Sequence, residues 1–287
     1  MTSEPVYRQG WSPDDIAWER FDRAKAEPWM IAAIKSAALV EYNAPDYVGY
    51  LKRVFPDPDF HPIIEQWGRE ERQHGDVLGR WAELADPTFK LEEAFARFRA
   101  GYRPAHFDGD DETSIRGSKR GEMIARCVVE SGTSTYYTAI KEATAEPVLQ
   151  EIAGRIAADE YRHYKLFYET LQTQGEADLP FWRKFLIAIG RMNESDDDEI
   201  AFSHYCATVA AADVATRPYS RSSCTRNLFG ITLRIYRRRH IEKLTRMVAK
   251  AVGADPQGRI VKLAGVAIWR LLKVRAGLIG ATAATAA

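Results

Sequence analysis

Two short stretches of this sequence, Glu70-Glu71-Arg72-Gln73-His74-Gly75 and Asp159-Glu160-Tyr161-Arg162-His163, share one spacing. In each stretch a glutamate is followed three residues later by a histidine. On an α-helix, residues three apart lie on the same face about one turn from each other. Each pair lies within an apolar stripe that recurs at steps of three and four, as in a helix that faces a core. The two stretches therefore predict a buried Glu/His pair on each of two helices.

Two other segments with helical periodicity each carry one carboxylate in an otherwise apolar stripe. Glu41 lies between Ile34 and Val48 at heptad spacing, and Glu130 follows Cys127 by one turn. Together with the two Glu-x-x-His pairs, these carboxylates would point into one helix-bundle core. Buried carboxylates need compensation, because each unpaired buried charge costs several kcal/mol.

Two divalent cations would neutralise such a core. One glutamate from each of two helices plus Glu-x-x-His from each of two others is the ligand set of di-iron and di-manganese helix bundles. The alternative is a helix bundle whose carboxylates form structural ion pairs with arginines such as Arg72 and Arg162. We predict two iron ions per chain, with manganese as an option at one position. The predicted metal ligands are Glu41, Glu71, His74, Glu130, Glu160 and His163.

The periodicity of the whole chain is helical, and Pro and Gly fall mainly between the periodic segments. We expect an all-α protein: a ferritin-like four-helix bundle with additional helices and a basic C-terminal helical tail. Residues 1–215 would form the bundle, and residues 216–287 the basic amphipathic tail. The expected helices are Trp29–Val54, His61–Leu84, Leu91–Arg99, Lys119–Ala145, a helix from Pro147 to Thr173, one from Pro180 that breaks around 194–199, Leu228–Val252 and Arg259–Ile279.

Charge is unevenly distributed along the 287 residues, although 40 Lys and Arg balance 40 Asp and Glu. Residues 217–287 contain fifteen Lys and Arg and only two acids, a charge of +13, so the first 216 residues carry −13. Three cysteines, none in a CxxC motif, exclude a disulfide framework and a zinc ribbon. The charged N-terminal stretch is unlike a signal peptide, and lysines and arginines interrupt the tail well short of the roughly 20 apolar residues that span a bilayer. We expect a cytoplasmic protein, with peripheral membrane contact as an option.

The basic tail contains two amphipathic patterns. On a helical wheel Arg259, Lys262, Arg270 and Lys273 fall within about 80°, beside an apolar face. A second basic stripe contains Arg239, Lys243, Arg246 and Lys250. Basic amphipathic helices favour anionic surfaces, so the candidate targets are an acidic acyl carrier protein, an anionic membrane and the acidic body of this chain. We expect no nucleic acid partner, because no recognised binding motif accompanies the charge. A homodimer is a further expected assembly.

The two Glu-x-x-His stretches resemble the two metal-binding motifs of the soluble acyl-[acyl-carrier-protein] desaturases. The resemblance covers roughly residues 30–173 and implies the six metal ligands given above. It also implies that Asp159 accepts the ring N–H of His74, and that Thr133 supplies a hydroxyl beside the oxygen-binding face. The family has a surface tryptophan for electron entry, which the sequence alone does not assign to Trp11, Trp18 or Trp29.

The resemblance further implies an oxygen-dependent di-iron oxidoreductase. Such an enzyme introduces a double bond into a fatty-acyl chain carried on acyl carrier protein, using molecular oxygen and two electrons from a ferredoxin-like donor. The alternatives are another di-iron hydroxylase or oxidase acting on a small molecule, and a ferritin-like iron-binding protein or ferroxidase without organic turnover. An elongated cavity running past Glu130 and Thr133 would favour the desaturase, and a closed site would favour the ferroxidase.

Overall fold

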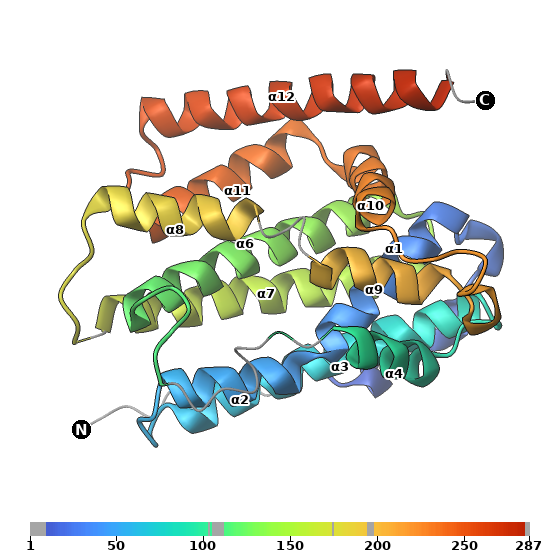
Figure 1. The fold of residues 1–287 in the computed structure, drawn as a ribbon, viewed down its shortest axis with the longest axis horizontal. Coiled ribbons are helices and arrows are strands. Elements are labelled where there is room, and N and C mark those ends of the chain that lie inside the picture. The colour runs from blue at the N-terminus through green and yellow to red at the C-terminus, as the bar shows by residue number, and fades with distance from the viewer. Residues whose placement is uncertain (1–9, 103, 105–111, 174, 194–197, 285–287) are drawn as a thin grey trace.

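The computed structural model describes residues 10–284 apart from 103, 105–111, 174 and 194–197, and the prediction of an all-α protein is confirmed. Every regular element within these residues is a helix (Figure 1). Most of the break expected around 194–199 lies outside the described residues.

Four helices contain the predicted ligands: α1 (Pro28–Tyr42), α3 (His61–Ala85), α6 (Lys119–Ala143) and α7 (Pro147–Thr173). Helix α6 packs along α7, α1 packs along α3, and α3 also meets α7. The connection between α6 and α7 is only three residues long, which makes them antiparallel neighbours. Their ends agree with the sequence prediction to within two residues, apart from the end of α1.

The first predicted helix, Trp29–Val54, was wrong as a single element, because the structure divides it at Asn43 into α1 and α2 (Ala44–Val54). Pro45 lies in the first turn of α2. Proline has no N–H and its ring clashes with the carbonyl one turn earlier, so it is tolerated at a helix start and breaks a helix interior. The break directly follows the turn that carries Glu41.

Glycine lets α1 approach α3 closely beside the predicted site. A Cβ built on Gly75 would lie 2.7 Å from the backbone nitrogen of Tyr42 and 2.9 Å from its Cα atom. These separations are too short for any larger side chain without displacing the backbone. Gly75 directly follows His74, so this contact fixes the end of α1 opposite that histidine.

The remaining helices surround these four. Helix α8 and helix α11 both pack on α6, α9 packs on α1, α10 packs on α9, and α12 packs on α11. The predicted helix Leu228–Val252 was also wrong as one element: α10 begins earlier, at Arg221, and a break at Tyr236–Arg237 separates it from α11. No helix in the described part of the chain combines the length and apolarity needed to cross a bilayer. The bounds are α4 (Leu91–Gly101), α8 (Phe181–Asn193), α9 (Asp198–Thr208), α10 (Arg221–Ile235), α11 (Arg238–Ala251) and α12 (Arg259–Ala284).

The apolar core forms two clusters along the four central helices. On α3, Trp67 belongs to one cluster and Leu78 to the other; on α6, Met123 and Ile140 are divided in the same way. Glu71 and His74 lie between the two clusters on α3, and the corresponding stretches of α6 and α7 carry the other predicted ligands. The polar centre is thus enclosed between two apolar layers.

Candidate metal centre

The six predicted ligands come from four helices, and all six are buried. Glu41 lies on α1, Glu71 and His74 on α3, Glu130 on α6, and Glu160 and His163 on α7. None is more than 8% exposed. The side chains lie together although the outermost of them are more than 120 positions apart in the sequence.

The structure assembles these side chains into two overlapping groups. Glu41, Glu71, His74 and Glu160 form one group, and Glu71, Glu130, Glu160 and His163 form the other. In each group, one potential ligand atom per residue lies within 4.8 Å of all the others. Glu71 and Glu160 are common to both groups. Each group could hold a metal ion, and the pair is compatible with a dinuclear centre.

Each histidine is oriented by a carboxylate behind it. His74 Nε2 lies 3.1 Å from Asp159 Oδ2, as the family resemblance implied. His163 Nε2 lies 2.7 Å from Glu70 Oε2, a contact that the sequence analysis missed. The signal was present, because an acidic residue directly precedes the glutamate of each Glu-x-x-His pair. Such carboxylates fix the orientation of a metal-binding imidazole and leave its other nitrogen to the metal.

The buried polar atoms that face the cluster indicate what kind of ligand these residues could bind. Nδ1 of His74 lies 3.2 Å from Glu160 Oε1, and Nδ1 of His163 lies 3.0 Å from Glu71 Oε1. Among the described residues, both Nδ1 atoms, both carboxylate oxygens of Glu130 and Oε1 of Glu160 are buried without a hydrogen-bond partner. Buried polar atoms are rarely left unpaired. Five such atoms within one buried cluster fit the donor sets of hard or borderline metal cations.

Burial and like charge determine the protonation of the metal-free carboxylates. Burial raises the pKa of Glu41 well above its ordinary value, and the neighbouring Glu71 adds to this effect. Burial also raises the pKa of Glu130, with Glu160 and Glu71 adding to it. Burial opposes ionisation of Glu71 too, but its contacts with His163 and His74 outweigh burial and hold its pKa well below the ordinary value.

The histidines carry protons for a related reason. Burial disfavours the charged imidazole, but contacts with Glu70 and Glu71 outweigh it and raise the pKa of His163 to about 9. Burial is likewise outweighed at His74, where Asp159, Glu160 and Glu71 raise the pKa well above its usual value. Metal binding needs neutral imidazoles and ionised carboxylates, so protons must leave this cluster when a cation enters.

Two hydroxyl groups contact the cluster. Thr133, predicted beside the centre, donates a hydrogen bond from Oγ1 to Glu160 Oε2 at 2.5 Å. Tyr137 donates from its hydroxyl to Glu41 Oε1 at 2.5 Å. The tyrosine is buried, and its hydroxyl holds a predicted ligand in place.

Trp11 reaches the centre from the N-terminal segment. Its Nε1 donates to Asp159 Oδ2 at 2.7 Å, the same oxygen that contacts His74. The rings of Trp11 and His74 are stacked at a centroid distance of 6.2 Å. Of the three tryptophans considered from the sequence, the structure thus places Trp11 against the carboxylate–histidine pair. No short-range signal marks it, because the contact spans 148 residues.

In the described part of the chain, neither Arg72 nor Arg162, the arginines named in the alternative interpretation, forms an ion pair with any of the six predicted ligands. Arg72 Nε lies 3.8 Å from Asp76 Oδ1. Arg162 pairs at 2.5 Å with Asp159 and at 3.6 Å with Glu70. Both partners of Arg162 lie behind the histidines, so this arginine supports the orienting carboxylates and leaves the ligand atoms facing one another.

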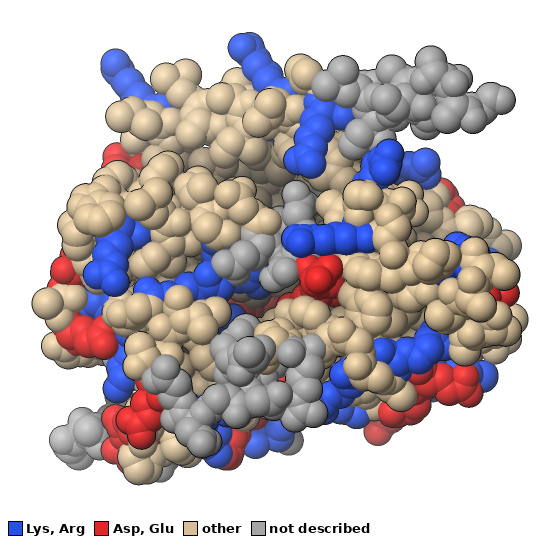
Figure 2. Space-filling model, viewed as in Figure 1, with Lys and Arg blue, Asp and Glu red and all other residues tan. Residues whose placement is uncertain are grey.

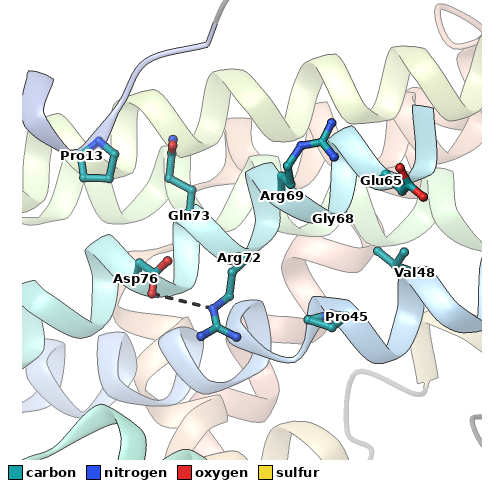
Figure 3. A pocket seen from close by; sticks show the side chains of 9 residues that line it. All are labelled: Pro13, Pro45, Val48, Glu65, Gly68, Arg69, Arg72, Gln73 and Asp76. Atoms are coloured by element: carbon teal, nitrogen blue, oxygen red, sulfur yellow. Dashed lines mark ion pairs between the residues drawn. The ribbon is translucent and has the colours of Figure 1, made fainter. Parts of the chain in front are cut away.

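A surface pocket lies on the outward side of α3, over α2 (Figure 3). Its lining includes Arg69, Arg72 and Asp76 from α3 and Pro45 and Val48 from α2. None of the predicted site residues lines it, because these α3 side chains point away from the helix face that carries Glu71 and His74. This pocket is therefore separate from the candidate metal centre.

Comparison with known proteins gave no family model and no curated protein that matches this chain.

Proposed function

We propose that α1, α3, α6 and α7 are a ferritin-like four-helix bundle, and that the protein is an oxygen-dependent di-iron oxidoreductase. The most specific form of the proposal is an enzyme that introduces a double bond into a fatty-acyl chain carried on acyl carrier protein in the cytoplasm. The substrate assignment rests on the resemblance of the two Glu-x-x-His stretches to acyl-carrier-protein desaturases. The dinuclear assignment rests on the geometry of the site.

One observation carries the dinuclear assignment: the two potential ligand groups share Glu71 and Glu160. A single-metal site would need one group of ligands, whereas two overlapping groups supply two positions joined by common carboxylates. Glu41 and His74 would complete one position, and Glu130 and His163 the other. Carboxylate and imidazole donors suit iron and manganese. When bound, a pair of iron ions would supply the oxygen chemistry that removes hydrogen from an unactivated hydrocarbon.

The residues around the ligands would orient and isolate that chemistry. Asp159 and Glu70 hold the two imidazoles with their Nδ1 atoms toward the cluster. Thr133 places a hydroxyl proton at Glu160 Oε2. The apolar clusters on both sides exclude water, which strengthens the electrostatic interactions within the site.

The contacts of Trp11 support electron entry from an external donor of the ferredoxin class. The indole is half-buried, and Arg155 lies 5.6 Å above its ring. From Trp11 a continuous set of hydrogen bonds leads through one oxygen of Asp159 to His74. This arrangement connects the protein surface with a predicted ligand through only two intervening side chains.

The test is turnover with a defined substrate. The iron-loaded protein would be supplied with oxygen, a ferredoxin and its reductase, and acyl-acyl carrier proteins of graded chain length, and the products analysed by mass spectrometry. We expect acyl chains that have lost two hydrogens. The matched control is Glu130→Ala, which removes one predicted ligand and should abolish this product. An added hydroxyl group instead would indicate the alternative di-iron hydroxylase.

A ferritin-like ferroxidase without organic turnover is the second candidate, and the burial of the ligands favours it. None of the six is more than 8% exposed, and the pocket of Figure 3 does not reach them. A closed site admits oxygen and iron more readily than an acyl chain. In this case iron oxidation would proceed with oxygen alone, and every acyl chain would leave the assay unchanged.

A further inference from the structure

Helix α8 turns its apolar side outward. Five large apolar side chains on this helix are exposed, and Trp182 is 62% accessible. At 100° per residue they cover an arc of about 140°. A helix on a protein surface normally buries such a stripe against its own core. The exposed residues are Phe181, Trp182, Phe185, Leu186 and Ile189.

The polar side chains of α8 lie on the opposite, inward side. Arg183, Lys184 and Arg191 are only half-exposed, and Lys184 pairs with Asp178 at 3.0 Å. Ala188 is buried and packs in the cluster that also contains Met247 of α11. Helix α8 therefore packs on the body through Ala188 and the partly buried Ile187 and Met192, and its aromatic face remains exposed.

Helix α12 shows a related arrangement with charge added. Ile260, Leu263, Leu271 and Val274 are 62–82% exposed and span about 80° of the helix. Four cations occupy the next 80° or so of the wheel. Among the described residues none of the four forms an ion pair with the protein's own acids. They are Arg259, Lys262, Arg270 and Lys273.

Helix α11 provides an internal contrast, because its basic stripe contacts the protein itself. Arg239 pairs with Glu142 at 2.5 Å, and Lys243 and Lys250 lie over the rings of Tyr161 and Tyr168. Three of the four cations of this stripe thus contact other helices of the protein. Within the described part of the chain, the four cations of α12 form no such ion pair, and α12 packs on α11 from outside.

The two helices with exposed apolar stripes are linked through α6 and α11. Helices α8 and α11 both pack on α6, and α12 lies over α11 (Figure 1). Lys184 Nζ lies 3.3 Å from the point where a Cβ built on Gly253 would lie. Gly253 belongs to the connection that leads into α12. Figure 2 shows Lys and Arg side chains projecting from α12 away from the body, and mostly uncharged surface over α8.

The sequence of these two helices selects the chemistry of the partner. Neither residues 181–193 nor residues 259–287 contain an acidic residue. A second copy of this surface would oppose cation to cation, which is unfavourable. A surface with anionic groups above an apolar layer matches both features, and Trp, Phe and Leu beside Lys and Arg are typical of helices that lie in a lipid interface.

We propose that α8 and α12 form a membrane-docking surface that binds anionic phospholipid bilayers peripherally. The apolar residues of α8 and the stripe of α12 enter the headgroup–acyl boundary, and the flanking cations of α12 contact the lipid phosphates. This inference goes beyond the proposed function and does not depend on the metal centre.

The test is flotation of the full-length protein with vesicles of neutral phosphatidylcholine, with or without anionic phosphatidylglycerol. We expect binding to the anionic vesicles that weakens steeply as salt rises, because exposed charges are screened over about 8 Å at physiological ionic strength. K262E/R270E should lower the partition coefficient on the order of 30-fold or more, since each basic residue near such a surface contributes roughly 1 kcal/mol. W182S/F185S should also lower binding, to neutral and anionic vesicles alike.

Matched variants on other surfaces separate docking from general effects. R20E/K90E changes the net charge by the same amount as K262E/R270E, at two exposed cations outside α8 and α12. I115S/V214S removes two exposed apolar side chains, also outside these helices, and matches W182S/F185S. Both should bind vesicles like the unmodified protein. Helix content, measured by circular dichroism, verifies that every variant is folded.

Three results would overturn the proposal. One is a folded protein that does not bind anionic vesicles at low salt. Another is vesicle binding that K262E/R270E and W182S/F185S leave unchanged. The third is a protein that does not bind vesicles but binds acyl carrier protein, or forms a dimer, through a contact that these two variants abolish.

Discussion

Glu70 Oε2 lies 2.7 Å from Nε2 of His163, on the side of the imidazole ring that faces away from the other predicted ligands. Asp159 makes the equivalent contact with His74 at 3.1 Å. In both cases the carboxylate belongs to the residue directly before the glutamate of the opposite Glu-x-x-His pair. Each of α3 and α7 therefore carries a pair of predicted ligands and also orients the histidine of the other helix.

This reciprocal arrangement predicts that two conservative changes have similar effects. Glu70→Gln and Asp159→Asn keep the size of the side chain and remove the negative charge behind the histidine. We expect each to weaken metal binding by roughly 10–100-fold, the usual cost of losing such a partner, with the fold retained. Isothermal titration with Fe(II) or Co(II) without oxygen measures the effect. Glu65→Gln, on the outer side of α3, is the control; metal affinity unchanged in both test variants would show that neither carboxylate orients its histidine.

The raised pKa values predict how pH changes metal binding. The raised pKa values of Glu41, Glu130, His74 and His163 favour protons on these groups in the metal-free cluster. These protons must leave before the groups can bind a cation, so metal affinity should rise from pH 6 to pH 8. Titration in two buffers of different ionisation enthalpy should reveal proton release. Proton uptake, or affinity that falls with rising pH, would contradict these protonation states.

The same shifts predict the stability of the metal-free protein. A group whose pKa is higher in the folded state stabilises the fold below its unfolded pKa, and this stabilisation is lost as pH rises through the folded value. For His163 the window runs from 6.5 to about 9. Glu41 and Glu130 act in the same direction, whereas Glu71, with its lowered pKa, stabilises the fold above its usual value of 4.5. We expect the melting temperature of the metal-free protein to fall from pH 6.5 to pH 9 and the stabilisation by metal to grow over the same range.

The close approach at Gly75 predicts that replacing this glycine by alanine lowers the unfolding free energy much more than the same change at an uncrowded glycine. Gly75→Ala would place a methyl group 2.7 Å from the Tyr42 backbone nitrogen, and backbone cannot move aside as a flexible side chain can. We expect a loss of about 1–3 kcal/mol in unfolding free energy, as for other overpacked sites, together with weaker metal binding through displacement of Glu41. Gly230→Ala in α10 meets no atom within 4 Å and should be neutral or slightly stabilising. Chemical denaturation distinguishes the two, and equal effects would mean that the approach of α1 to α3 is not restrictive.

The central helices and the clustering of the six predicted ligands could be predicted because their signals are local and repeated. The Glu-x-x-His spacing and the apolar stripes locate α3 and α7, and the single carboxylates locate α1 and α6. The break at Asn43 had a local signal in Pro45, but the expected helix Trp29–Val54 continued through this proline. The break at Tyr236–Arg237 had none, because neither Pro nor Gly occurs between residues 231 and 252. There, packing of α10 on α9 and of α11 on α6 determines where the helix divides.

The contacts of Trp11 and Tyr137 with the centre could not be predicted from the sequence. Trp11 meets Asp159 across 148 residues, and Tyr137 meets Glu41 across 96. Periodicity assigns a residue to a face of its own helix but does not identify the atom opposite. The outward orientation of the apolar face of α8 could not be predicted for the same reason, since an amphipathic pattern is normally taken to face inward.

The contact between Trp11 and Asp159 predicts a kinetic effect that leaves the metal content unchanged. Trp11→Phe removes the indole N–H and interrupts the set of hydrogen bonds from the surface to His74. Under the proposed function, stopped-flow reduction of the iron-loaded protein by ferredoxin should slow at least tenfold. Reduction by a small chemical reductant should change little, and Trp18→Phe, which alters an indole bonded to the Pro13 carbonyl, is the control. Equal slowing in both variants would argue against a specific route through Trp11.

The central claim is that two metal positions share Glu71 and Glu160, and metal stoichiometry after anaerobic Fe(II) loading and desalting tests it most directly. The unmodified protein should retain about two ions per chain. Glu41→Ala removes a ligand of only one group and Glu130→Ala a ligand of only the other, so each should retain about one. Glu71→Ala/His74→Ala should retain close to none, with helix content unchanged. Full retention in this double variant, or at most one ion in the unmodified protein, would contradict a dinuclear centre built from these residues.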